Sequence, residues 1–395
     1  MSAAAHKASV SGNLTAARFR AADTKKEGET MEFYLIQTFT TAARPHFAEA
    51  LRLVQGTASA KEDTRLTVLS SAEAFARAAR NGSLRDAVLL FAAQTDTAGM
   101  DADTLALLRF LHLHEKEQPL AGSRAGILID GENDFFTKDL GRRIAFAVSL
   151  CGCALPGKPL VESTSDLHSF TVLASLWQTD RYTAYLKSCR LLVEKLRTFA
   201  PAQITRPKLL AVHAGNHKTS NSLSLWQLTA AALVGKADIA EISLRNGQIW
   251  DCRGCKYEDC LHFGEQGDCF YGGVMTEKVY PAIIKSDVVV LICPNYNDSV
   301  SANIMAFINR LTSVFRVNDF SAKRVYAIIV SGYSGGDLVA QQIIGAMNMN
   351  KNMLLPPRFA LLETANAPGE VLQIPGTKEK AANFAASIVS FPDRH

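Results

Sequence analysis

The sequence lacks a long apolar run, since no stretch approaches the roughly 18 consecutive residues that a membrane-spanning helix requires. It also lacks an excess of one charge, because 42 Lys and Arg face 38 Asp and Glu along the chain. No segment is basic enough to serve as a nucleic-acid footprint, and no signal-peptide core stands near the start. We therefore expect a cytoplasmic protein without a membrane span or a nucleic-acid partner.

The composition is that of a globular protein, with 48% apolar and 20% charged residues. A chain of 395 residues favours two or three domains. Residues 1–30 hold eight alanines and show no apolar periodicity, so we expect a disordered extension. Acidic side chains are absent before Asp23, which leaves an organellar presequence open as the alternative.

From residue 31 onward, β-prone runs alternate with helical patterns in two successive series, which predicts two doubly wound parallel sheets. The ten expected strands are 33–37, 65–70, 87–91, 125–130, 159–162, 208–213, 237–244, 287–293, 323–331 and 358–363. Two prolines within 200–207 break any helix there. We therefore predict an α/β domain over 31–200, a linker over 201–206 and a second domain over 207–395.

The two predicted domains show signs of duplication. Sliding the chain by 201 positions places Ile127–Gly131 on Ile328–Gly332 and keeps the order strand, glycine turn, helix, proline, strand. The identities are few, so convergence on one supersecondary pattern is the alternative.

The strand 208–213 runs into a loop of small polar residues over Ala214–Ser222, followed at once by a helical pattern. Ligands of open α/β sheets bind at the carboxyl ends of strands, and a helix N-terminus favours an anion. The loop therefore suits a phosphate monoester. It matches neither GxxxxGK[ST] nor GxGxxG, which argues against an NTPase or Rossmann site. The same residues are also common in ordinary turns and N-caps.

A second polar loop follows the apolar run Asp287–Cys293, which predicts a buried parallel strand. Tyr296 offers a flat face to an aromatic ring, while the neighbouring amide and hydroxyl groups offer hydrogen bonds. An ordinary βα loop is the alternative. In a sheet of order 2-1-3-4-5 the first and third strands are neighbours, so a phosphate site and a ring site would lie side by side. FMN binding requires that arrangement.

The loop Ala214–Ser222 resembles the phosphate loop of NAD(P)H-dependent FMN reductases and iron–sulfur flavoproteins, and Cys293–Ala302 with Ala306–Arg310 resembles their ring-binding segment. The resemblance covers about residues 207–390. It implies a flavodoxin-like fold, bound FMN and electron transfer. It implies no catalytic side chain, because the cofactor performs the chemistry. The implied cofactor contacts are His217, Lys218, Ser220, Asn221 and Ser222 for the phosphate; Pro294, Asn295, Tyr296, Asn297 and Ser299 for the ring; and Ser331, Gly332 and Gly335 for its far side.

The resemblance does not extend to residues 31–200. The first strand there runs into Thr38–Pro45, which lacks the small flexible residues of the second domain's loop. We expect a cofactor-free flavodoxin-like domain, a degenerate duplicate, that serves packing, dimerisation or partner docking.

Four of the eight cysteines lie in the predicted loop 252–269, as Cys252-x2-Cys255-x4-Cys260-x8-Cys269. In a large intracellular chain such a cluster favours metal binding over disulfides. Four thiolates can ligate a [4Fe–4S] cluster or zinc. Iron–sulfur flavoproteins begin their motif Cys-x-Gly-Cys, as Cys252–Cys255 does, although the later spacings here are longer. Zinc, redox-active thiols and unligated cysteines remain open.

Together these features predict an FMN-dependent oxidoreductase or electron-transfer flavoprotein with a [4Fe–4S] cluster. Its donor would be NAD(P)H or a ferredoxin, and the sequence does not name the acceptor. The alternatives are a flavin-only NAD(P)H reductase with a zinc or free-thiol loop, and a non-enzymatic electron carrier or redox sensor. Members of the family often pair, so we expect a homodimer.

Overall fold

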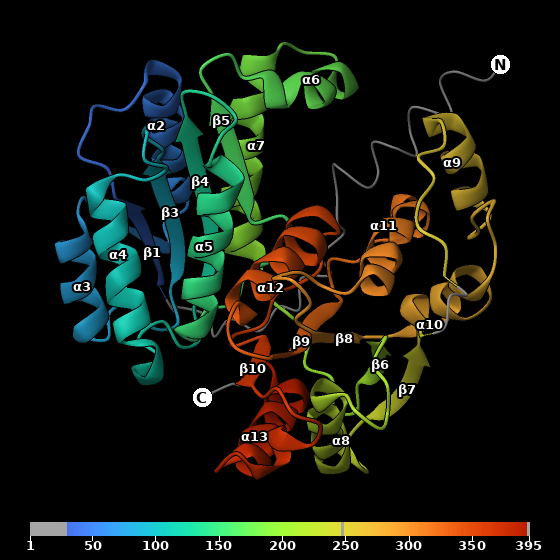
Figure 1. Cartoon of the computed structure of the whole chain (residues 1–395). Coiled ribbons are helices and arrows are strands. Elements are labelled where there is room, and N and C mark those ends of the chain that lie inside the picture. Colours follow the sequence, from blue (N-terminus) through green and yellow to red (C-terminus); the bar gives the residue numbers. More distant parts are fainter. Residues whose placement is uncertain (1–29, 246–248, 393–395) are drawn as a thin grey trace. The chain divides into compact units, whose positions relative to one another are not determined.

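The computed structural model describes residues 30–245 and 249–392, which form two compact units divided between Ala200 and Pro201 (Figure 1). The extension predicted over residues 1–30 lies outside the described residues except for Thr30. None of the helices in these two ranges combines the length and apolar character needed to cross a bilayer.

The N-terminal unit is built on a parallel sheet of order β2-β1-β3-β4-β5. Its strands are β1 (Met31–Gln37), β2 (Thr64–Leu69), β3 (Val88–Gln94), β4 (Arg124–Gly131) and β5 (Leu160–Thr164). Its helices are α2 (Pro45–Ser59), α3 (Ala72–Arg80), α4 (Ala102–Leu113), α5 (Thr137–Leu150), α6 (Thr171–Trp177) and α7 (Arg181–Thr198). The central strand β3 is buried along its whole length, as its unbroken apolar sequence predicts.

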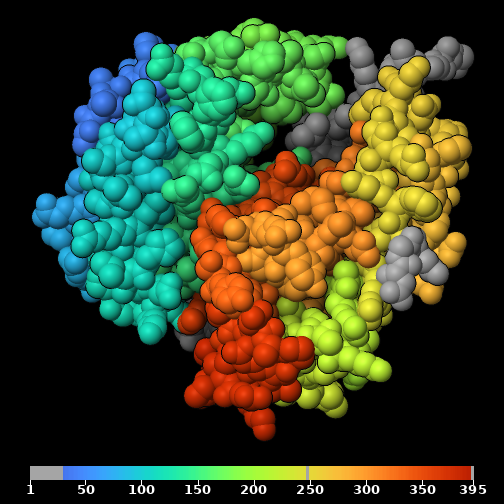
Figure 2. All heavy atoms as spheres, viewed as in Figure 1, coloured from blue at the N-terminus to red at the C-terminus, as the bar shows by residue number. Residues whose placement is uncertain are grey.

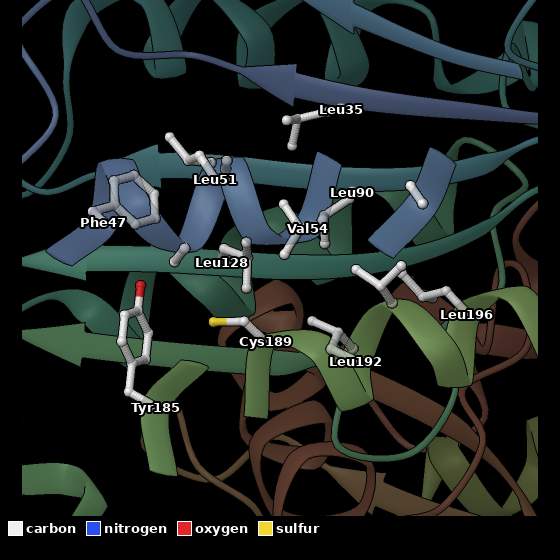
Figure 3. Close-up of a cluster of buried hydrophobic side chains, with 14 of the residues drawn as sticks. Leu35, Phe47, Leu51, Val54, Leu90, Leu128, Tyr185, Cys189, Leu192 and Leu196 are labelled. Atoms are coloured by element: carbon white, nitrogen blue, oxygen red, sulfur yellow. The ribbon is translucent and has the colours of Figure 1, made fainter. Parts of the chain in front are cut away.

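Helices α2 and α7 pack against each other on one face of this sheet, and α3, α4 and α5 lie on the other. Figure 3 shows side chains of α2 and α7 meeting Leu90 and Leu128 of the sheet. Helix α7 begins where Asp180 accepts a hydrogen bond from the Thr183 N–H at 2.9 Å. Burying a leucine or valine in such a core stabilises the fold by about 1.5–3 kcal/mol.

The C-terminal unit repeats this plan, with a parallel sheet of order β7-β6-β8-β9-β10. Its strands are β6 (Lys208–His213), β7 (Asp238–Ser243), β8 (Val288–Pro294), β9 (Arg324–Ser331) and β10 (Ala360–Thr364). Its helical segments are α8 (Asn221–Leu233), α9 (Tyr257–Glu265), η3 (Met275–Val279), α10 (Tyr280–Lys285), α11 (Ala302–Val317), α12 (Gly336–Ile343), η4 (Ile344–Asn350), η5 (Glu370–Gln373) and α13 (Thr377–Ser390). Both sheets have the predicted order, so the predicted fold class is confirmed.

The cysteine-rich segment differs from the sequence-based expectation, because the predicted loop 252–269 contains the helix α9. Two acidic residues in its first turn, Glu258 and Asp259, favour a helix start there. Gly264 allows close packing on α11, since a Cβ at this position would lie 2.8 Å from the Ser313 carbonyl oxygen. Part of the cysteine-rich segment is therefore a helix that packs against α11.

The two units correspond in the details of their fourth strands and of the turns beyond. Arg124, which is partly buried, and Arg324, which is buried, begin β4 and β9, and each forms an isolated parallel bridge with a residue beyond the next helix. Lys158 and Arg358 both take a left-handed backbone, with φ of 51° and 50°. The sequence identities were found at an offset of 201 positions, which is one more than the offset between the structurally equivalent Arg124 and Arg324. Because side chains alternate along a strand, the sequence alignment pairs residues that lie on opposite faces of the two sheets. The two units therefore share topology and backbone details, whereas the sequence identities do not fall on structurally equivalent positions.

Candidate functional site

A cavity of about 600 Å³ lies at the carboxyl ends of β6, β8, β9 and β10 in the C-terminal unit. Three polar loops and the residues just after β10 contribute its walls. Its lining residues are Asn216, Thr219, Ser220, Asn221, Ser222, Pro294, Asn295, Tyr296, Asn297, Asp298, Val330, Gly332, Tyr333, Ser334, Ala365 and Asn366. This is the edge at which open parallel sheets bind ligands.

The loop after β6 presents the N-terminus of α8 to this cavity. The Ser220 hydroxyl caps the helix by accepting a hydrogen bond from the Leu223 N–H at 3.3 Å. One turn earlier, the Asn216 carbonyl accepts the Thr219 and Ser220 N–H groups at 3.1 and 2.9 Å. Ser222 follows in the first turn, 1% exposed, and its Oγ has no hydrogen-bond partner among the described residues. The loop therefore offers a free buried hydroxyl at the positive end of a helix.

The loop after β8 is a tight turn. Tyr296 and Ser299 exchange two backbone hydrogen bonds of 3.1 Å, and the residues between them, Asn297 and Asp298, have φ of 52° and 56°. Two successive left-handed residues are typical of a type I′ turn, and Asn and Asp tolerate that conformation. Gln342 of α12 supports the turn, since it accepts the Val300 N–H at 3.1 Å and donates to the Asp298 carbonyl at 3.1 Å.

Asn295 joins the loops that follow β8 and β9. Its Nδ2 donates to the Ser331 hydroxyl at 3.2 Å and to the Ser334 carbonyl at 2.7 Å. Its Oδ1 is buried and has no partner within the described ranges. Tyr296 and Tyr333, 58% and 82% exposed, also line the cavity. The site thus combines a free acceptor with exposed aromatic faces, which suits a flat heterocycle with polar edges.

A second cavity of about 560 Å³ in the same unit, which we call the cysteine basin, is lined by all four clustered cysteines. Cys252 and Cys255 are exposed, while Cys260 of α9 and Cys269 are partly exposed. Figure 2 shows this segment, in yellow, at the surface. The C-terminal half of α11 forms the opposite wall, and its lining residues are Asn309, Arg310, Thr312, Ser313 and Arg316.

The charges around the cysteine basin are positive at its base. Arg310 is 2% exposed; its Nη2 donates to the Gly272 carbonyl at 2.9 Å, but its Nε and Nη1 have no partner in the described residues. Burial raises the pKa of the Cys260 thiol, Arg316 opposes that rise, and the other three cysteines add to it. The basin therefore brings the four cysteines beside arginine side chains.

Residues 207–367 match the family model of NADPH-dependent FMN reductases. The match confirms the resemblance inferred from the sequence, and it indicates an NAD(P)H-dependent flavin oxidoreductase. FMN as cofactor and NAD(P)H as donor fit this family. Among curated proteins, none matches the chain.

Solved structures that match about half of this chain include two bacterial proteins and one archaeal protein. The Trp repressor binding protein of Bacillus subtilis is 19% identical and the match covers 45% of this chain and 97% of that chain, with a TM-score of 0.31. An NAD(P)H:quinone oxidoreductase of Methanothermobacter marburgensis is 11% identical, and the match covers 48% of this chain and 98% of that chain, with a TM-score of 0.36. An azoreductase of Bacillus anthracis strain Sterne is 15% identical, and the match covers 47% of this chain and 97% of that chain, with a TM-score of 0.29.

The structure gathers most of the contacts implied by the resemblance to FMN reductases around one cavity. Those that line it are Ser220, Asn221, Ser222, Pro294, Asn295, Tyr296, Asn297 and Gly332. Those outside the lining are His217, Lys218, Ser299, Ser331 and Gly335. Asn221 also has a structural role, because its Nδ2 donates to the Ala365 and Ala367 carbonyls at 3.2 and 2.8 Å.

Sequence reasoning missed the part of the cavity that follows β10. Asn366 lines the cavity, and its Nδ2 donates to the Tyr333 hydroxyl at 3.2 Å. Its backbone is fixed by Glu370, whose carboxylate accepts the Asn366 N–H at 2.7 Å. The available signal was its position directly after the fifth strand of the series, at the same sheet edge as the two predicted loops.

We expect Gly335→Ala to weaken FMN binding at least tenfold. Gly335 has φ of 82°, and a Cβ there would lie 2.0 Å from Asp298 Oδ1 and 2.9 Å from Asn295 Nδ2. Gly376→Ala is the matched control, because φ is 78° and a Cβ would meet nothing within 4 Å. Both variants carry left-handed strain of about 1–2 kcal/mol. Fluorescence titration with FMN compares them, and equal affinities would contradict a role of Gly335 in shaping the site.

The corresponding edge of the N-terminal unit contains an internally paired polar cluster. Asp130, at the end of β4, is fully buried and contacts Arg44 Nη1 at 2.5 Å and His46 Nε2 at 2.7 Å. The Ser163 hydroxyl donates to the same carboxylate at 2.8 Å. Arg44 directly precedes α2, as the loop Ala214–Ser222 leads into α8 in the C-terminal unit. These polar side chains therefore bond to one another. In the cavity of the C-terminal unit, by contrast, Ser222 Oγ and Asn295 Oδ1 have no hydrogen-bond partner among the described residues.

Asp130→Asn is expected to lower the free energy of unfolding of the N-terminal unit by about 3 kcal/mol, because removing one partner from a buried ion pair strands the other. Asp139→Asn removes an exposed carboxylate that pairs with Arg143 on the helix surface, and it should change stability by less than about 1 kcal/mol. Urea unfolding of the full chain, followed by circular dichroism, measures both. Similar values for the two variants would show that the buried cluster is not stabilising.

Proposed function

We propose that this chain is an FMN-dependent oxidoreductase that takes electrons from NAD(P)H and relays them through a [4Fe–4S] cluster to an acceptor. The observation that carries the flavin half is the pair of unpartnered buried groups in one cavity, the Ser222 hydroxyl and Asn295 Oδ1. A buried polar atom without a partner costs about 1–3 kcal/mol, so a ligand that supplies both partners is favoured. FMN, with a phosphate at one end and a polar ring at the other, supplies both.

The residues present fit FMN. We propose that Ser220, Ser222 and the first N–H groups of α8 hold the phosphate, which helix N-termini favour. Asn295, Tyr296 and Asn297 would hold and orient the ring, and Tyr333 would shield it from water. FMN, when bound, supplies hydride acceptance from NAD(P)H and single-electron release. The side chains bind and position the cofactor, and we assign no proton transfer to any of them.

The cysteine basin fits an anionic iron–sulfur cluster. Two buried Arg310 donors lie free in its wall, and a cluster ligated by four thiolates would bring compensating negative charge. Within the described residues, no three of the cysteine sulfurs lie within 4.8 Å of one another. Tetrahedral zinc needs thiolate sulfurs about 3.8 Å apart. The described cysteines therefore do not form the compact sulfur tetrahedron that zinc uses, and a larger four-iron cluster is the assignment that we propose.

Helix α11 connects the two sites. It begins at Ala302, just after the loop that follows β8, and Arg310 on the same helix lines the cysteine basin. Eight residues of helix span about 12 Å. This short rigid connection supports electron transfer between FMN and the cluster.

We propose a cytoplasmic homodimer with domains over 31–200 and 207–395 and a linker over 201–206, in which the N-terminal domain serves packing, dimerisation or partner docking. A ferredoxin is the alternative donor, and the acceptor is a further redox partner.

The proposal is tested on full-length protein purified without oxygen, by its absorption spectrum and its flavin, iron and zinc content. Flavin with about four irons per chain, and steady oxidation of NAD(P)H when an artificial acceptor is added, is the expected result. Flavin without iron would instead favour the flavin-only reductase. Stoichiometric reduction without turnover would favour an electron carrier. A colourless protein that does not take up added FMN would overturn the proposal.

A further inference from the structure

Three side chains outside both cavities gather beside the phosphate loop. His213 ends β6 and is 1% exposed, His217 lies in the loop that follows, and Glu241 belongs to the neighbouring strand β7. In the parallel register Glu241 lies opposite Ala211, so its side chain shares a sheet face with His213. One ligand atom from each of the three residues lies within 4.8 Å of the others.

The distance between His213 and Glu241 suits joint ligation of a metal ion better than a direct hydrogen bond. His213 Nε2 lies 3.3 Å from Glu241 Oε1. A charge-assisted N–H···O bond is about 2.7–2.9 Å long. Two ligands of a tetrahedral zinc site, each about 2.0–2.1 Å from the ion, are about 3.3–3.4 Å apart. The rings of His213 and His217 meet edge to face, with centroids 5.3 Å apart, so the second imidazole borders the same space.

The surrounding residues hold His213 and Glu241 in positions that favour metal ligation. His213 is buried at the end of β6, which fixes the position of its imidazole. The indole Nε1 of the fully buried Trp226 donates to Glu241 Oε2 at 2.7 Å. This bond orients the carboxylate and leaves Oε1 toward His213, as outer-shell partners do in metal sites.

We propose that His213, His217 and Glu241 bind one divalent transition-metal ion of the zinc class. Two imidazoles and one carboxylate are a ligand set that zinc uses, and imidazole suits nickel, cobalt and copper as well. His217 and Glu241 reach solvent, so water completes the coordination. The ion would tie the loop Ala214–Ser222 to β7. This site does not depend on the proposed flavin or cluster.

Cobalt titration of the metal-free full-length protein tests the site. Cobalt in the cysteine basin gives intense sulfur-to-metal charge-transfer absorption in the ultraviolet, whereas cobalt on imidazole and carboxylate gives only visible bands. We expect one cobalt per chain of the second kind. His217→Ala and Glu241→Gln should each weaken that binding at least about a hundredfold, and Trp226→Phe about tenfold, as loss of an outer-shell partner does.

His168→Ala is the matched control, because it removes an exposed imidazole of the N-terminal unit. It should bind cobalt as the wild type does. Circular dichroism establishes that each variant is folded, and His217 lies in a loop where truncation leaves the sheet intact. Wild-type cobalt affinity and stoichiometry in both His217→Ala and Glu241→Gln would overturn the proposal. So would a wild-type protein whose cobalt spectrum shows thiolate ligation alone.

Discussion

Replacing Ser222 with aspartate is expected to raise the Kd for FMN at least about a thousandfold. The side chain is buried at the first turn of α8 and lines the cavity. A carboxylate there would face the phosphate at close range, and such like-charge contacts cost several kcal/mol. A free-energy change of about 1.4 kcal/mol corresponds to a factor of ten in Kd. Ser222→Ala should have a much smaller effect, of about five- to tenfold, because it removes one hydrogen bond without adding charge.

Equilibrium titration of apoprotein with FMN, followed by flavin fluorescence, measures these affinities. Gln227→Glu is the charge-matched control, since it adds one negative charge on an exposed position of the same helix, away from the cavity. Its Kd should remain within about threefold of the wild type, because solvent screens exposed charges. If Ser222→Asp and Gln227→Glu bound FMN equally well, the phosphate would lie elsewhere.

With the proposed [4Fe–4S] cluster, the second large effect is expected for Cys255→Ser, which should lose nearly all of its iron. A [4Fe–4S] cluster with four thiolate ligands depends on each of them, and serine is a poor replacement for a soft sulfur ligand. Cys255 lines the basin wall together with the other three clustered cysteines. Bound FMN should persist in this variant, because its cavity uses other residues. The absorption spectrum and iron analysis of anaerobically purified protein report both cofactors.

Cys189→Ala is the control, since Cys189 is buried in the core of the N-terminal unit, where burial raises its pKa to about 12. It should retain the wild-type iron content. Undiminished iron in Cys255→Ser would remove Cys255 from the ligand set. Equal loss of iron and FMN would instead indicate that the C-terminal unit had unfolded.

The sheets were predictable because the strands of parallel sheets are buried on both faces. Runs such as Val88–Gln94 and Val288–Pro294 are apolar without alternation, and polar loops bound them. The strand predicted over 208–213 has those limits in the structure. Helix α9 was missed because it is short, contains three acidic residues and a glycine, and depends on packing against α11 for its stability.

The candidate site was predictable only where chain order and spatial order coincide. The loops after β6 and β8 lie on neighbouring strands, so a topological rule brings them together. Asn366 follows β10 at the far side of the sheet, and its place in the cavity depends on its bond to Tyr333 and on Glu370. Similarly, Glu241 meets His213 through the β6–β7 register, which no local pattern in the sequence indicates.

The η4 segment accounts for a difference in length between the two units. Phe136 and Gly335 both precede the helix after the fourth strand in left-handed conformation, and Lys158 and Arg358 both follow it in that conformation. The stretch between these two markers is longer by a single position in the C-terminal unit. There the Lys351 N–H bonds to the carbonyl five positions back, whereas the Cys151 N–H of the N-terminal unit bonds four positions back. The π-turn of η4 accommodates this extra position, so the backbone of the two units matches again at Lys158 and Arg358 despite the difference in length.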